Sequence, residues 1–324
     1  MNPLVYDVLY RLLFVAHAVL AAEVAGGTLW LALRGLRAGS NEDPLAGALR
    51  DWLPFALGLA ITFGVGPLLL LQILDGDAFY TANLLLSHRF MALLPALIVG
   101  FYLLYVQKTK WRWVRSRGGR LAVPLVALGC FGYTAFCWST NHLLAQSEAD
   151  WAAVYVEQQG YLHRDLPFRL AAFFGVGLQA VAVLAGWQSP ALRSDAAGRR
   201  RLGTLAAIGA AVQLLALVLH PPVEGVTLLG ASGLLVLGAT VAVVAGLRRG
   251  WWPAATIALA VGVERLAALR EAVRVARGGA DRAEEYASAQ GFALFVVTLA
   301  GVGAAIAFGT VRVRRELASR QPRG

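Results

Sequence analysis

Long apolar stretches recur along this chain, separated by short polar loops. A hydrocarbon core of roughly 30 Å requires about 20 apolar residues per helix. The chain is 58% hydrophobic and 15% charged, which leaves too little polar surface for a soluble domain. We therefore predict an all-α fold: a polytopic membrane helix bundle of about nine transmembrane helices that forms a single integral membrane domain over residues 1–324. The predicted spans are residues 9–33, 52–74, 84–106, 121–143, 167–187, 202–220, 226–247, 252–273 and 289–311.

Basic and acidic residues occupy alternate loops. Lysines and arginines crowd residues 107–120 and 188–201, whereas aspartates and glutamates occur at 75–77 and 144–166. Because basic loops favour the cytoplasmic side, this alternation predicts an N-terminus outside and a cytoplasmic C-terminus. The formal net charge of +10 is distributed over these loops rather than gathered in one patch. The partner that it indicates is the lipid bilayer, and no nucleic acid is expected.

All five histidines fall in the outer portions of the spans or just beyond them. His17 lies roughly 12 Å below the outer end of the first span, and His88 lies in the first turns of the third. Ionisable residues inside a membrane are costly and are candidates for function, and neutral imidazole is a common ligand of haem iron. We predict His17 and His88 as metal ligands, with His142 and His220 as further cofactor-binding candidates. For each of these, and for His163, the alternative is hydrogen bonding or solvation at the interface.

Three more polar side chains are candidates for the same site. Arg270 and Arg274 lie one helical turn apart near the outer end of the eighth span, where they would clasp haem propionates. The alternative is a helix that leaves the membrane early and wets its charged end. Gln72 is a lone amide near the outer end of the second span, suited to a quinone, a haem or an interhelical hydrogen bond. Deeper in the eighth span, Glu264 and Arg265 require at least a mutual or interhelical ion pair.

Two segments carry a family resemblance: residues 14–17 (FVAH), and residues 55–81, which include GVGPLLLLQ and GDAFYT. They make the chain resemble the large haem-bearing subunit (subunit I) of cytochrome bd quinol oxidase, and more closely its short cytochrome b-like relatives in respiratory complexes. The resemblance covers about residues 1–190. It implies haem b as a cofactor, a quinone as a further ligand, and a multi-pass location in the bacterial inner (cytoplasmic) membrane. It carries the role of haem ligand over to His17.

The chain departs from that family at two places that bear on chemistry. The oxidase has acidic residues in helix three and a ligand histidine in helix five. This chain has no Asp or Glu from 78 to 147 and no His from 164 to 219. We therefore do not expect it to reduce oxygen itself.

The leading interpretation is a membrane subunit of a respiratory electron-transfer complex, which passes electrons between the quinone pool and an outer redox partner such as a periplasmic c-type cytochrome. Other membrane subunits would be its partners. One alternative is a haem-free scaffold subunit of such a complex. Another is an ion or solute carrier, suggested by the intramembrane charges of Glu23 and Glu264.

Overall fold

The chain folds into a bundle of long antiparallel helices. The computed structural model describes residues 3–36, 43–109, 112–157, 161–221 and 230–276, with scattered residues between 293 and 312. No β-strand occurs among these described residues. Eight helical segments are long and apolar enough to cross a membrane, which agrees with the predicted multi-pass helical bundle. They are α1 (Pro3–Gly35), α2 (Pro44–Leu74), α4 (His88–Met91) with α5 (Leu93–Lys108), α7 (Arg117–Ala145), α9 (Leu166–Gln188), α11 (Ala196–Val218), α12 (Ala231–Arg249) and α13 (Trp252–Ala276).

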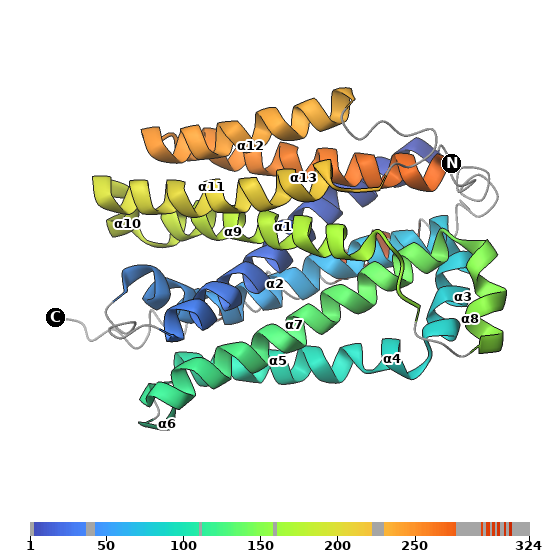
Figure 1. Ribbon diagram of the computed structural model, residues 1–324, viewed down its shortest axis with the longest axis horizontal. Helices are drawn as coiled ribbons and strands as arrows, with labels where there is room; N and C mark the ends of the chain where they lie inside the picture. The colour runs from blue at the N-terminus through green and yellow to red at the C-terminus, as the bar shows by residue number, and fades with distance from the viewer. Residues whose placement is uncertain are drawn as a thin grey trace.

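Successive long helices run in opposite directions, so their termini collect at two ends of the bundle (Figure 1). The basic end, on the left of the figure, contains Gly35 and Pro44 and carries the short helices α6 (Arg112–Arg115) and α10 (Pro190–Ser194). The histidine end, on the right, carries α3 (Gly76–Leu86), the 3₁₀ turn η2 (Glu148–Asp150) and α8 (Trp151–Glu157). Basic and acidic loops therefore lie at opposite ends of the bundle.

The predicted third span, residues 84–106, is interrupted near its start. Ser87 has a φ of 49°, which breaks the helical hydrogen-bond pattern between α3 and α4. Residues 84–86 consequently belong to α3, and the membrane-crossing segment begins at His88. The predicted boundary was therefore too early, because the apolar run continues through a backbone break that hydropathy does not register. The predicted ninth span, residues 289–311, lies largely outside the described residues and stays a prediction.

Helix α1 occupies the centre of the bundle and contacts α2, α7, α9 and α13. Glycines allow its backbone to approach α9 directly: a Cβ atom on Gly26 would lie 2.4 Å from the carbonyl carbon of Gly177. On the other side of α9, a Cβ on Gly209 would lie 2.4 Å from the carbonyl oxygen of Gly175. Small residues permit such close packing between membrane helices. Glycines thus fix α9 between α1 and α11.

Candidate functional site

His17 lies on the face of α1 that packs against α2. Its Nδ1 atom is 2.8 Å from the carbonyl oxygen of Ala60. A carbonyl can only accept, so Nδ1 carries the hydrogen, and in the neutral ring Nε2 then keeps its lone pair. No hydrogen bond to Nε2 is found within the described part of the chain. This arrangement, with one ring nitrogen anchored and the other available, is the one found in metal-binding histidines.

Two glycines of α2 make room for His17 and for its neighbour Leu13. A Cβ atom on Gly64 would lie 2.7 Å from His17 Nδ1, and one on Gly66 would lie 2.7 Å from Cδ1 of Leu13. Leu13 and His17 are one helical turn apart on α1, so both side chains pack on the face of α2 that carries these glycines. The sequence GVG that supports the family resemblance therefore has a local structural role: it lets the imidazole lie against the backbone of α2.

Arg270 of α13 packs beside the same part of α1. Its guanidinium carbon lies 4.1 Å from the centroid of the Phe14 ring and 5.8 Å from that of Tyr10, whose hydroxyl oxygen accepts a hydrogen bond from the guanidinium. The Phe14 and His17 rings are neighbours, with centroids 6.5 Å apart. A positive charge is thus held one turn from His17 by two aromatic rings. The side chain of Arg274, the other predicted propionate ligand, lies outside the described residues.

Glu264 and Arg265, which lie nearer the middle of α13 than Arg270, form ion pairs, as predicted from the sequence. Arg265 Nε bonds to Glu264 Oε2, and Nη1 of Arg11 on α1 lies 3.7 Å from Glu264 Oε1. The expected ion pair is confirmed and extends to a second helix.

His142 belongs to a separate polar cluster at the histidine end. Nη1 of Arg169 is 2.9 Å from its Nδ1, and Nε2 of Gln146 is 3.4 Å from its Nε2. Arginine can only donate, so Nδ1 is the accepting nitrogen of a neutral imidazole. Nδ1 is therefore engaged by Arg169, whereas Nε2 then carries the hydrogen and faces the amide nitrogen of Gln146, which is also a donor, so that contact is not a hydrogen bond. Arg169 was not singled out from the sequence, although its place one turn into the fifth span was a usable signal.

His163 and His220 flank a buried carboxylate, Asp165. Oδ2 of Asp165 lies 3.6 Å from Nδ1 of His163 and 3.9 Å from Nε2 of His220. Asp165 immediately precedes α9, and its side chain is only 2% exposed. Sequence reasoning treated Asp165 only as part of an acidic loop. The fold instead places it between two histidines from loops 57 residues apart, His163 and His220.

The remaining candidates are not joined to these clusters. His88 is exposed on the four-residue helix α4, and Gln72 is half-buried near the end of α2. Among the described residues, no other histidine ring contacts that of His17. In the same part of the chain, no group of three or more His, Cys, Asp or Glu side chains is arranged to hold a metal ion.

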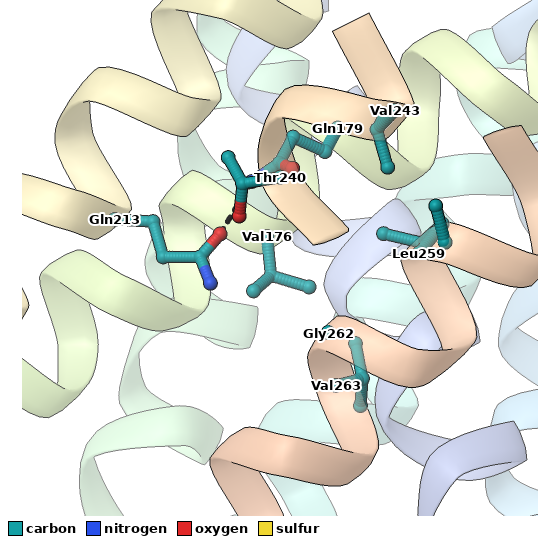
Figure 2. Close-up of a pocket in the computed structure, with 9 residues that line it drawn as sticks. Val176, Gln179, Gln213, Thr240, Val243, Leu259, Gly262 and Val263 are labelled. Atoms are coloured by element: carbon teal, nitrogen blue, oxygen red, sulfur yellow. Dashed lines mark hydrogen bonds between the residues drawn. The ribbon is translucent and has the colours of Figure 1, made fainter. Parts of the chain in front are cut away.

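A small polar cavity lies elsewhere, between α9, α11, α12 and α13. Gln179 donates from Nε2 to Oε1 of Gln213 and to the carbonyl of Gly175 at 3.4 Å, and Thr240 lies beside them. Figure 2 shows these polar side chains on one side of the lining and Val243, Leu259 and Val263 on the other. The volume is about 10 Å³, which suits one water molecule and is far too small for a haem.

At the basic end, Asp43 forms a buried ion-pair network. Its fully buried carboxylate accepts from the backbone N–H of Leu45 at 3.0 Å, and it pairs with Arg34 at 2.7 Å and with Arg201. Burial on its own raises the pKa of Asp43. The hydrogen bond from Arg201 and the charges of Arg201 and Arg34 outweigh burial and hold the pKa below its usual 3.8. Because all the donors and charges are protein groups, this network joins α1, α2 and α11 and is not a ligand site.

Comparison with protein-family models, curated proteins and solved structures finds no match for this chain.

Proposed function

We propose that this chain is a membrane subunit of a respiratory electron-transfer complex that binds b-type haem through His17. It would pass electrons between the quinone pool and an outer redox partner such as a c-type cytochrome, with its histidine end facing outward from a bacterial inner membrane. The observation that carries the proposal is the state of His17. Its Nδ1 is held by the Ala60 carbonyl, and its Nε2 lone pair is available inside an apolar span.

The surrounding residues fit one axial haem ligand. The Ala60 carbonyl would fix the imidazole orientation and make Nε2 a stronger electron donor. Gly64 would leave space for the ring, and Arg270 would offer positive charge to a propionate. When bound, haem b supplies one-electron transfer. His88, Arg274 and Gln72 remain candidates for a second ligand, a propionate contact and a quinone contact, respectively.

The test is a pyridine haemochrome spectrum with quantitative haem extraction on the purified complex. Wild-type protein should show b-type absorbance, and His17→Ala should lose it. His163→Ala is the matched control and should retain the haem, because His163 contacts Asp165 and is not a proposed ligand. Wild-type protein without b-type absorbance, or His17→Ala with undiminished haem, would contradict the proposal.

A second candidate is a haem-free scaffold subunit. It is favoured by the three histidines His142, His163 and His220, which all contact protein groups suited to a structural role. Under this alternative the purified, fully assembled complex contains no haem attributable to this chain, and His17→Ala alters assembly alone. The same extraction therefore separates the two functions.

A further inference from the structure

Glu23 is a carboxyl group enclosed by the bundle and unused by the haem proposal. It lies on α1 six residues past His17, about 9 Å closer to the basic end. The residue is 0% exposed. Its Oε1 accepts from Nε2 of Gln188 on α9 at 2.7 Å, and its Oε2 accepts from the indole N–H of Trp52 on α2 at 3.1 Å. Three helices thus meet at this one carboxyl.

Both donors to this carboxyl are neutral. Among the described residues, no ion pair connects Glu23 to a charged group, and the arginines on neighbouring helices are used elsewhere: Arg34 pairs with Asp43, and Arg270 packs on Tyr10 and Phe14. An ionised carboxylate in an apolar interior without a cation is costly, whereas the protonated acid is not. The other charged residues on α1, α2, α7, α9 and α13 are Asp7, Arg11, Arg34, Arg50, Asp51, Arg117, Arg120, Arg169, Glu264, Arg265, Arg270, Glu271 and Arg274, and the histidines on these helices are His17 and His142.

Gln188 is suited to both protonation states of Glu23. Its amide nitrogen donates to the carboxylate, while its Oε1 atom is buried and has no hydrogen-bond partner in the described structure. If the amide rotates, that oxygen can accept from the O–H of a protonated Glu23. Gln188 is also the last residue of α9, so it connects the buried carboxyl to the basic end.

We propose that Glu23 is a proton-binding site inside the membrane domain, loaded from the basic end through Gln188. The bound species is a proton rather than a metal cation, because Trp52 and Gln188 present hydrogen-bond donors to the carboxylate and not oxygen ligands. The inference stands independently of whether haem binds.

Labelling of the full-length protein with dicyclohexylcarbodiimide tests this proposal. A protonated carboxyl adds its O–H across one C=N bond of the reagent and rearranges to a stable N-acylurea, with no leaving group, so peptide mass spectrometry can locate the adduct. Glu23 should be labelled at neutral pH, and above its titration midpoint each pH unit should lower labelling about tenfold. Glu264 is the internal control, because it forms ion pairs with Arg265 and Arg11 and should not be labelled.

Glu23→Gln keeps the side-chain volume, and its amide can accept from Trp52 and donate to Oε1 of Gln188 once the Gln188 amide rotates, so the variant should fold and should abolish the adduct. An infrared titration of the two proteins is the second readout. A carboxylic C=O band should be present in the wild type at neutral pH, disappear as the pH rises, and be absent from Glu23→Gln. Labelling of Glu23 no stronger than that of Glu264, together with no such band, would overturn the proposal. If the reagent cannot reach the carboxyl, the infrared band alone decides whether Glu23 binds a proton.

Discussion

The basic end and the histidine end of the bundle handle buried polar groups differently. At the basic end, Asp43 is closed off by two arginines from other helices, and every contact is a short charge-assisted bond. At the histidine end, where the short helices α3, α4 and α8 also lie, Asp165 has histidines at 3.6 and 3.9 Å. The first arrangement joins α1, α2 and α11 through short ion pairs. The second places the carboxylate between two imidazoles at longer distances and forms no short ion pair with them.

The close packing of α1 on α9 gives the largest expected effect. Gly26→Ala would place a methyl group 2.4 Å from the Gly177 carbonyl carbon, so the backbones must separate. We expect a loss of roughly 3 kcal/mol in the free energy of unfolding, measured by denaturation in detergent or bilayers. Gly58→Ala is the control, since no atom lies within 4 Å of its added Cβ. Equal stability of the two variants would show that this backbone contact does not anchor the bundle.

The charge network at the basic end comes next. Asp43→Asn should cost about 2 kcal/mol, because Arg34 and Arg201 lose their shared carboxylate but remain partly accessible to water. The pKa of Asp43 is lower in the folded protein, so its stabilisation is fully present above the unfolded value near 3.8 and is lost as the pH falls through the folded value. Wild-type and Asp43→Asn stabilities should therefore converge in strong acid. A constant difference down to the lowest pH would contradict the assignment.

Between the two ends, the Gln179–Gln213 pair tests a neutral interhelical bond. A double-mutant cycle of Gln179→Leu and Gln213→Leu should give a coupling of about 1 kcal/mol, typical of hydrogen bonds between membrane helices. Thr240→Val at the same cavity is the matched control: its hydroxyl donates to the Val236 carbonyl within α12, so it should not couple to Gln179. A coupling near zero for the glutamine pair would mean that water replaces the bond.

The smallest effect is expected at the histidine end. His220→Ala should change the free energy of unfolding by about 0.5 kcal/mol at neutral pH, because its Nε2 lies 3.9 Å from the Asp165 carboxylate. Unfolding of the purified protein would measure this, with Asp43→Asn as the reference. If His220→Ala cost as much as Asp43→Asn, the contrast between a tightly paired basic end and a loosely paired histidine end would be wrong.

The amino-acid sequence by itself determined the positions of the membrane-crossing helices. Over their described residues, seven of the predicted spans each match one continuous helix to within a few residues, and the loops separate by charge as predicted. Hydropathy succeeds here because the cost of placing a segment in hydrocarbon is a sum over that segment alone. It missed the break at Ser87, because that break depends on one residue's backbone angle.

Only the tertiary structure decided which polar groups meet. The partners of His17, Glu23 and Asp43 lie 43, 165 and 158 residues away in the chain. Their meeting depends on the rotation of each helix about its axis and on the order of helices in the bundle. Glycine contacts such as Gly26 with Gly177 fix the rotation of the helices and their order, because two helix backbones can touch only where neither residue carries a side chain. A single sequence shows the glycines but not which of them face each other.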